Sequence, residues 1–404
     1  STEADPSLHG RSLKYPRGRV LGGSSSINGM IYMRGQAADY DSWAAAGNAG
    51  WAWRDVLPLF KRSEQHFAGA SQWHGGGGEW RVERQRLSWE ILEAFREAAA
   101  QSGIASIDDF NGGDNEGCSY FQVNQKRGVR WNASKAFLRD IRQRPNLQVL
   151  TGAEAERLEL ADGRVRALHL RWQGQALRIA ARREILLCAG AIGSPALLQR
   201  SGIGPRPLLE KLGIGVRHEL PGVGENLQDH LQLRLIYRIS GVKTLNRIAA
   251  TSWGKLGMAL EYLLKRSGPL SMAPSQLGAF AKSDPEQARA NLQYHVQPLS
   301  LERFGEPLHD FPAFTASVCH LRPHSRGRVA IASADAGAAP LIRPNYLSDE
   351  RDLRVAADAI RLTRRIVAAP ALARYQPQEY KPGPDYGSEE DLQRAAGEIG
   401  TTIF

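Results

Sequence analysis

Residues 18–32 read Gly-Arg-Val-Leu-Gly-Gly-Ser-Ser-Ser-Ile-Asn-Gly-Met-Ile-Tyr. A short extended run leads into Gly22 and Gly23, where a backbone without Cβ atoms can turn sharply or pass close to a ligand. Residues 24–26 are serines, at the expected start of a helix, where unpaired N–H groups and the helix dipole favour an anion. Asn28 and Gly29 are poor helix formers, which indicates a functional constraint. The alternative is an ordinary Gly/Ser-rich loop.

Two later stretches also contain closely spaced glycines. Residues 190–198 read Gly-Ala-Ile-Gly-Ser-Pro-Ala-Leu-Leu and follow an apolar run at residues 184–189, which predicts a strand buried on both faces of a parallel sheet. Ser194 is the expected N-cap and Pro195 the first residue of the following helix. Such a strand, glycine turn and helix form the crevice in which open α/β sheets bind ligands, although an ordinary βα unit looks the same. The third stretch, residues 220–230, reads Leu-Pro-Gly-Val-Gly-Glu-Asn-Leu-Gln-Asp-His.

Together, residues 18–41, 190–204 and 220–230 resemble the signatures of the glucose–methanol–choline (GMC) flavin oxidoreductases. The resemblance implies an α/β plus α+β fold, in which an incomplete Rossmann-like FAD-binding domain carries an antiparallel-sheet substrate domain. The implied domains are residues 1–40 (flavin-contacting signature and lid), 41–128 (cap and substrate-side segment), 129–235 (FAD-binding domain), 236–385 (substrate-binding domain) and 386–404 (start of the return to the FAD domain).

The resemblance also implies site residues. FAD is expected against Val20, Gly23, Ser24, Asn28, Gly29, Met30, Ile31, Ala155, Ala189 and Gly190. Ile27 occupies the position where some members attach FAD through a His, so a non-covalent flavin is expected. Asn226, Asp229 and His230 match a run that gives structural support near the cofactor.

Substrate class is expected to depend on Gln276, which stands where choline-type members carry a Glu that pairs with a quaternary ammonium. A cation that enters an apolar pocket without a counter-charge faces a large desolvation cost. The parent enzyme is therefore expected to prefer neutral primary alcohols over choline.

Two parts of the family pattern are not found in the sequence. Residues 1–17 hold no G-x-G-x-x-G fingerprint and are too few for a βαβ unit of about 30 residues. The family's catalytic His, and its second His or Asn, are expected beyond Phe404, so no catalytic residue is expected within the chain. These points predict an internal fragment that does not oxidise alcohols, with the coding DNA continuing at both ends.

Three functions remain open at this stage. The leading one is FAD-dependent oxidation of a primary alcohol to an aldehyde by hydride transfer to flavin N5 in the parent enzyme. The alternatives are a hydroxynitrile lyase of the same fold and a non-catalytic remnant that binds a flavin or a partner. The expected partners are a small alcohol and an unidentified electron acceptor.

Composition and residue spacing limit the possible partners, metal content and location of the protein. The net charge of the 404 residues is +10, but the basic residues are scattered rather than gathered, so nucleic acid is not an expected partner. Cys118, Cys188 and Cys319 lie far apart, which indicates reduced thiols and a cytoplasmic location. His320 and His324 have no second cluster of ligands nearby, so no metal site is expected. No run of about 18 apolar residues occurs; only peripheral contact with the inner membrane is left open.

Periodicity predicts the secondary structure of most of the chain. Residues 75–78, four glycines, are expected in a mobile surface loop. Helices are expected at 91–98, 133–141, 253–264 and 355–366, and strands at 147–150, 165–170, 176–179, 231–239 (half-buried), 278–281, 292–296, 314–319 and 328–331.

Overall fold

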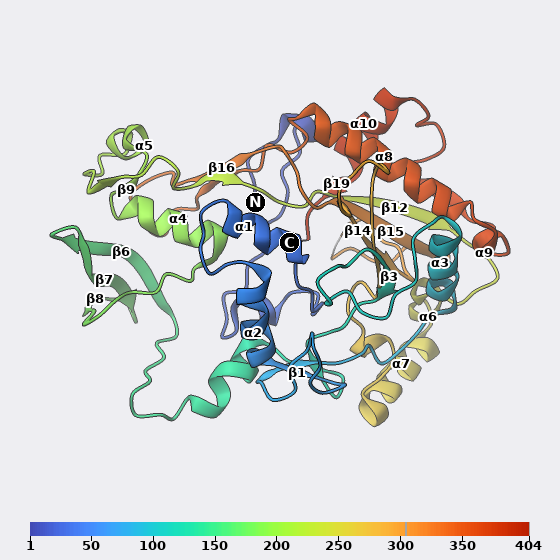
Figure 1. The fold of residues 1–404 in the computed structure, drawn as a ribbon, viewed down its shortest axis with the longest axis horizontal. Coiled ribbons are helices and arrows are strands. Elements are labelled where there is room, and N and C mark those ends of the chain that lie inside the picture. The colour runs from blue at the N-terminus through green and yellow to red at the C-terminus, as the bar shows by residue number, and fades with distance from the viewer. Residues whose placement is uncertain (304, 404) are drawn as a thin grey trace.

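A seven-stranded antiparallel sheet, at the right of Figure 1, organises the computed structural model, which describes residues 1–303 and 305–403. The strand order is β18-β12-β15-β14-β13-β3, and β19 also pairs with β12. The strands are β3 (Gly117–Tyr120), β12 (Gln232–Arg238), β13 (Leu277–Ala281), β14 (Leu292–Gln297), β15 (Ala313–His320), β18 (Gln378–Lys381) and β19 (Gly400–Thr401). The antiparallel sheet expected of a substrate domain is thus confirmed. Phe404, after which the sequence analysis places a cut, lies outside the described residues.

Helices cover one face of this sheet. They are α3 (Glu90–Gln101), α8 (Glu350–Val367) and α10 (Glu389–Ile399), which lie along its outer side in Figure 1. Phe95 of α3 contacts Tyr294 and Phe314 on the sheet, with ring centroids 6.4 and 6.1 Å apart. Each such fully buried side chain contributes about 1.5–3 kcal/mol relative to exposure. This face is the main hydrophobic core, and the helices predicted at 91–98 and 355–366 are confirmed.

The other face of the sheet is buried as well. Strand β12 was expected to be half-buried, but its residues are buried from Gln232 to Tyr237. The reason is visible at Gly278, where an added Cβ would come within 2.1 Å of the Phe121 ring. The chain that follows β3 therefore lies directly on this second face. Polar side chains that alternate with apolar ones along the strands point into the molecule and not to solvent.

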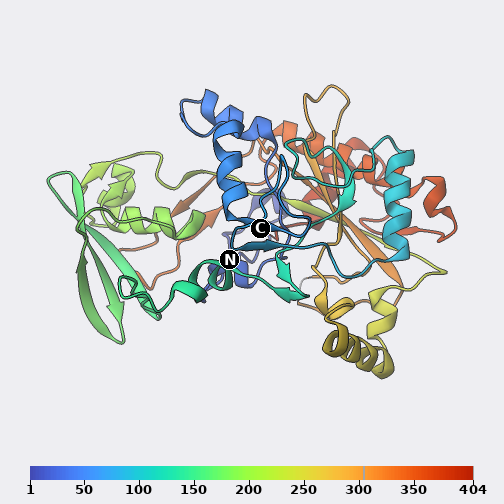
Figure 2. The ribbon, with the colours of Figure 1, turned by 60° about the horizontal axis from the view of Figure 1, so that its bottom comes forward.

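A smaller lobe lies at the left of Figures 1 and 2. Its antiparallel sheet has the order β6-β7-β8, and Asp162 and Gly163 form the turn between the first two strands, both with positive φ. The strands predicted at 165–170 and 176–179 are confirmed as β7 and β8, which pair with each other in antiparallel fashion. The lobe comprises β6 (Ala153–Ala161), β7 (Arg164–Trp172), β8 (Gln175–Ala180), α4 (Gly190–Arg200), β9 (Ile203–Gly204), α5 (Arg206–Lys211) and β10 (His218–Glu219).

Two predicted strands are wrong. Residues 147–150 and 184–189 form no strand, and Leu186 is 77% exposed. A parallel strand needs hydrogen-bonded neighbours, and parallel pairing of named strands within residues 1–303 and 305–403 is confined to β9–β10 and to β1 (Glu64–His66) with β2 (Trp80–Val82). An apolar run without such neighbours stays irregular.

The start of α4 also differs from its prediction. The helix begins at Gly190, so Ala189 and not Ser194 is the N-cap, and Pro195 lies inside the helix. Gly190 has φ 77°, a conformation that glycine adopts without strain, and this lets the chain enter the helix earlier.

The remaining elements connect these parts. Residues 133–141 are helical as predicted, but as a π-turn (Ser134–Leu138) followed by a 3₁₀-turn (Arg139–Ile141). The other helices and strands are α1 (Ala37–Ala45), α2 (Trp53–Ser63), β4 (Gln125–Lys126), β5 (Val129–Arg130), β11 (Glu225–Leu227), α6 (Leu245–Ala249), α7 (Ser252–Lys265), β16 (Gly327–Ala330), β17 (Leu341–Arg343) and α9 (Pro370–Ala373).

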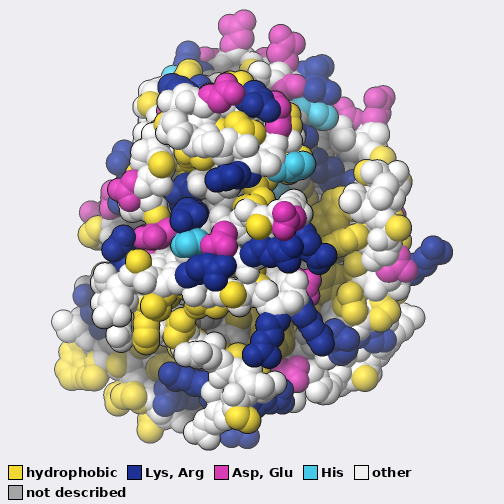
Figure 3. Space-filling model, turned by 90° about the vertical axis from the view of Figure 1, so that its left-hand side faces the viewer, with side chains coloured by type: hydrophobic (Ala, Val, Ile, Leu, Met, Phe, Trp, Pro, Cys, Tyr) yellow, Lys and Arg dark blue, Asp and Glu magenta, His cyan; other side chains and the backbone are white. Residues whose placement is uncertain are grey.

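Figure 3 shows one face of the molecule, on which basic side chains are interspersed with acidic and hydrophobic ones.

Candidate functional site

The glycine–serine stretch forms a turn that only glycine fits well. Gly22 and Gly23 have φ of 92° and 55°, and a 3₁₀-turn follows at Gly23–Ser26. Ser26 Oγ donates to the carbonyl of Leu21 at 2.9 Å, and Gly18 N donates to Ser24 Oγ at 3.2 Å. The α-helix expected after the glycines is thus only one 3₁₀-turn.

This turn presents apolar side chains to the outside. Val20 is 59% exposed and Ile27 is 50% exposed, while an added Cβ at Gly23 would meet nothing within 4 Å. Exposed apolar groups beside an open glycine backbone suit a flat, largely apolar ring system bearing phosphates. The residues present therefore fit a flavin dinucleotide.

The end of the stretch is anchored to the interior. Asn28 Oδ1 accepts hydrogen bonds from Met30 N at 3.0 Å and from Arg130 Nη1 at 2.8 Å. Met30 is buried, with φ 61°, and Ile31 forms a β-bridge with Val123. A Cβ at Gly29 would lie 3.7 Å from the Pro274 ring. The turn is therefore held beside the segment that leads to Gln276.

The remaining predicted cofactor residues lie in the smaller lobe. Ala155 is in β6, and its carbonyl accepts from Arg200 Nη2 of α4 at 3.5 Å. Ala189 and Gly190 are exposed at the N-terminal end of α4, where the first N–H groups of a helix have no intrahelical acceptor. The predicted residues thus fall into two groups, one in the glycine–serine turn and one at β6 and α4.

Gln276 lies inside the molecule, just before β13. Its side chain is fully buried, and neither amide atom, Nε2 or Oε1, has a hydrogen-bond partner within the described part of the chain. An unsatisfied buried amide costs about 1–3 kcal/mol, so a water or ligand is expected to complete it. Gln297 on β14 is also buried and has its Oε1 unpartnered.

A polar row crosses the sheet on the same face. Strand pairing aligns Gly278 with His295, His295 with Ser317, and Ser317 with Arg234. Burial, with a smaller contribution from nearby His230, lowers the pKa of His295 to about 3, so the imidazole is neutral at pH 7. Burial also lowers the pKa of Arg234, to about 10, and the guanidinium stays charged at pH 7. The row offers a substrate a neutral imidazole and a cation.

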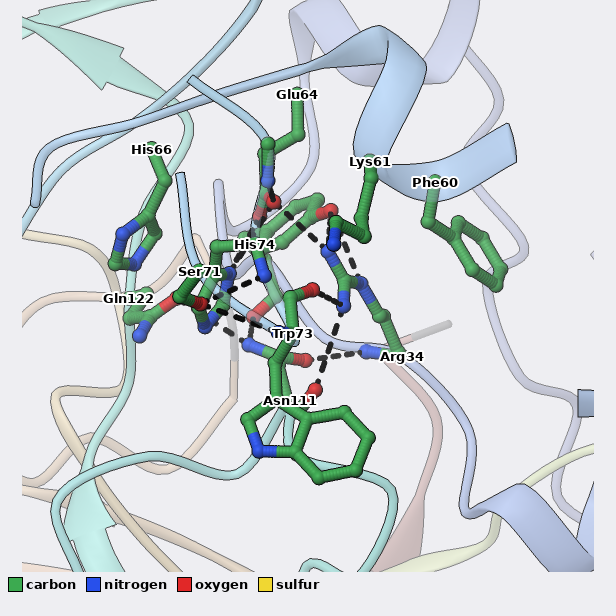
Figure 4. A network of polar contacts seen from close by, with 12 residues as sticks. Arg34, Phe60, Lys61, Glu64, His66, Ser71, Trp73, His74, Asn111 and Gln122 are labelled. Atoms are coloured by element: carbon green, nitrogen blue, oxygen red, sulfur yellow. Dashed lines mark hydrogen bonds and ion pairs between the residues drawn. The ribbon is translucent and has the colours of Figure 1, made fainter. Parts of the chain in front are cut away.

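A second polar cluster, shown in Figure 4, joins distant segments of the chain. Arg34 Nη2 lies 2.9 Å from Glu64 Oε2, and Arg34 Nη1 donates to the carbonyl of Trp73 at 2.7 Å. His74 bridges two carboxylates, with Nδ1 3.0 Å from Glu64 and Nε2 2.5 Å from Asp109. Because the Arg34–Glu64 pair is almost completely buried, loss of one partner would leave an uncompensated charge.

The pKa of His74 reflects this bridge. Burial alone lowers it, but the hydrogen bonds to Asp109 and Glu64 outweigh burial and raise the pKa to about 9. Burial lowers the pKa of His66, whose ring stacks on His74 at a centroid distance of 3.8 Å, and the charge of His74 lowers it further. His74 is therefore the protonated member of the cluster at neutral pH.

The four-glycine run closes the same cluster. Gly75 N donates to Glu64 Oε2 at 2.7 Å, and an added Cβ at Gly75 would lie 1.8 Å from the Lys61 carbonyl oxygen. At Gly78 the Cβ would lie 2.2 Å from Ser63. The surface-loop prediction is thus wrong for the ends of the run, which pack against backbone.

The third stretch, residues 220–230, is held in place by hydrogen bonds to distant residues. Asp229 Oδ2 accepts hydrogen bonds from the hydroxyls of Tyr15 and Tyr346. His230 Nε2 lies 3.1 Å from the Leu321 carbonyl oxygen, and burial lowers its pKa. Asn226 adopts φ 60° at the start of β11–β16 pairing. These contacts link separate segments of the chain.

The sequence alone did not point to Arg34, Glu64, His74, Arg234 or His295. A signal existed for the strand residues, because Gln293, His295 and Gln297 alternate along β14 and Gln232 and Arg234 alternate along β12, all on the same face of the sheet. For β12 this polar face was expected to be exposed, because the covering segment could not be foreseen. The cluster around His74 gives no local pattern, since its members are far apart in the sequence. Among residues 1–303 and 305–403, no group of three His, Cys, Asp or Glu is placed to hold a metal ion.

Comparison with known proteins identifies related sequences. Two family models, both described as GMC oxidoreductase, match residues 4–232 and 323–403. An alcohol dehydrogenase (acceptor) from Pseudomonas putida is 37% identical, over 98% of this chain and 72% of the relative. An oxygen-dependent choline dehydrogenase from Paraburkholderia phytofirmans is 38% identical, over 100% of this chain and 72% of the relative. Because both family models match, the comparisons give no support to the expectation of an inactive internal fragment.

Solved structures show the same fold. Pyridoxine 4-oxidase from Mesorbium loti superposes with a TM-score of 0.87 at 29% identity, over 99% of this chain and 75% of that one. An FAD-dependent oxidoreductase from Chaetomium thermophilum has a TM-score of 0.90 at 24% identity, over 99% of this chain and 78% of that one, a likeness of fold alone.

Proposed function

The chain belongs to the GMC oxidoreductase family, and we propose that it oxidises a neutral primary alcohol to an aldehyde with FAD as the oxidant. When bound, FAD would accept the hydride of the alcohol carbon at flavin N5, and the hydroxyl proton would pass to water. The relatives named for alcohol and choline oxidation support the reaction class.

Cofactor binding in this proposal falls to the two groups of predicted residues. Val20, Gly23 and Ile31 would face the flavin, where open glycine backbone and exposed apolar side chains occur together. Gly190 at the α4 N-terminus would face the phosphate or adenosine end, since a helix N-terminus favours anions. No covalent link is proposed, because Ile27 has no nucleophilic atom.

The substrate hydroxyl is the partner that we propose for Gln276. Its Nε2 can donate and its Oε1 can accept, which matches an alcohol O–H that does both. The buried, unpartnered amide beside the glycine–serine turn is the observation that carries the proposal.

Charge on the same sheet face argues against choline. Gln276 provides no negative charge, and the polar row on the same sheet face ends in the Arg234 cation, three strands away from β13. A quaternary ammonium brought into this buried face would lose its hydration without a counter-charge from Gln276. A neutral alcohol avoids this cost.

The test compares hexanol with choline as substrates of the purified, FAD-loaded chain, by dye reduction against a flavin-only blank. The proposal predicts a higher kcat/KM for hexanol. A clear preference for choline would contradict the substrate class, and no alcohol-dependent reduction with either compound would contradict the function.

A further inference from the structure

Helix α7 turns its apolar side away from the protein. It spans Ser252–Lys265, and none of its residues is buried. Trp253 is 83% exposed, Leu264 is 80% exposed and Leu263 is 67% exposed, and Leu256 and Leu260 are half-exposed. These residues recur at spacings of three and four, so they form one stripe, whereas helices of globular proteins turn such a stripe inward.

The helix stands out from the molecule. Figures 1 and 2 both show α7 at the lower edge, beyond the sheet and its covering helices. Leu270, on the short 3₁₀-turn that follows, is also 55% exposed and extends the apolar surface. A projecting apolar ridge of this kind marks an interaction site.

Basic residues border the stripe. Lys255, Lys265 and Arg266 are exposed, and the structure gives the two lysine ammonium groups no ionic partner within the described residues. Glu261 is the single acidic residue of the helix, and its carboxylate is folded back, accepting from Ser267 Oγ at 3.1 Å. The surface therefore combines apolar side chains with unneutralised positive charge.

We infer that α7 is a peripheral membrane anchor that inserts its apolar stripe into the surface of an anionic bilayer. A helix with Trp and Leu on one side and Lys or Arg beside them lies in the headgroup region in this way. Each cation near an anionic surface adds attraction that salt weakens. The unpaired lysines favour a lipid surface over a second copy, which would bring the same cations face to face.

Length excludes a transmembrane role for this helix. Its 14 residues extend about 21 Å, less than the hydrocarbon thickness of about 30 Å. No helix of the described residues combines the length and apolar content needed to cross a bilayer. The inference goes beyond the proposed function and does not depend on the substrate.

The first test is flotation of the purified chain with vesicles of phosphatidylcholine alone or mixed with phosphatidylglycerol. We expect binding to the mixed vesicles, weakened at least about tenfold in the double variant Trp253→Ser/Leu264→Gln. Leu186→Gln is the matched control, because Leu186 is as exposed as Leu264 but lies elsewhere, and it should bind as the unmodified chain does. All these side chains are exposed, so equal thermal unfolding midpoints will confirm that the variants are folded.

A second measurement locates the inserted residue. Quenching by brominated lipids should be stronger for the unmodified chain than for Trp253→Phe, which keeps the apolar area but removes that indole. Three results would overturn the inference: no binding to phosphatidylglycerol vesicles, equal loss of binding in the Leu186 control, or a concentration-dependent dimer that the double variant abolishes.

Discussion

Gln276 is the residue on which we propose that substrate choice rests. Sequence resemblance pointed to it, and the structure adds that its amide is fully buried and without partners among the described residues. Arg234 and His295, which lie in the polar row on the same sheet face, could not be assigned from sequence, because burial of the second face of the sheet depends on Phe121 and the chain after β3. A strand pattern gives the alternation of side chains and not what covers each face.

Replacement of Gln276 by Glu should shift specificity toward choline. The carboxylate would supply the counter-charge that the buried face lacks, and it would disfavour an apolar alcohol by its own desolvation. The ratio of kcat/KM for choline to that for hexanol should rise about tenfold or more, in line with a gain of one ion pair. Gln276→Leu is the control, since it removes the hydrogen bonds without adding charge and should slow both substrates. An unchanged ratio in Gln276→Glu would show that this residue does not set specificity.

His74 should make stability depend on alkaline pH. Its folded pKa of about 9 lies above the ordinary value of 6.5, so its stabilisation is complete below about pH 6.5 and is lost as pH rises through about 9. The free energy of unfolding should fall by up to about 3 kcal/mol over that range.

Urea unfolding at a series of pH values measures this slope, and His74→Gln should flatten it. His218→Gln is the control, because His218 is exposed, and it should leave the slope unchanged. A slope that survives in His74→Gln would place the titrating group elsewhere.

Among the helices and strands, those that depend on local sequence patterns were predicted correctly. Helix α7 and strands β7, β8 and β13 to β16 appeared where periodicity placed them. The strand predicted at residues 184–189 was wrong, because an apolar run becomes a strand only when another strand pairs with it. The surface loop predicted for the four-glycine run was wrong at its ends for a related reason, since those glycines contact distant residues of α2 and β1.

Two glycines of that run give a matched pair of variants. Gly75→Ala would place a Cβ 1.8 Å from the Lys61 carbonyl oxygen, whereas Gly77→Ala would meet nothing within 4 Å. Gly75→Ala should therefore lower the free energy of unfolding by about 2 kcal/mol or more, because backbone must move. Gly77→Ala should be neutral or stabilise by up to about 1 kcal/mol. Chemical denaturation measures both, and equal effects would contradict the packing of residues 61–64 against the run.

At the scale of the whole molecule, the proposed site draws on parts that lie far apart in sequence. Gly29, at the end of the glycine–serine stretch, lies beside Pro274, two residues before Gln276, and the polar row on β12, β14 and β15 lies on the same face of the sheet as Gly278. Family resemblance predicted the cofactor and the antiparallel sheet. The resemblance could not predict the exposed apolar stripe of α7, because exposure of a helix face is a property of the folded chain.

Anaerobic reduction of the bound flavin by hexanol is the decisive test of the proposed alcohol oxidation. The chain is loaded with FAD, hexanol is added without any electron acceptor, and the visible flavin absorption and the aldehyde are followed together. The account predicts bleaching of the flavin with one aldehyde formed per flavin reduced, and slower bleaching with choline. Flavin that binds but is not bleached by hexanol would contradict the account and would instead favour a non-catalytic flavin-binding protein.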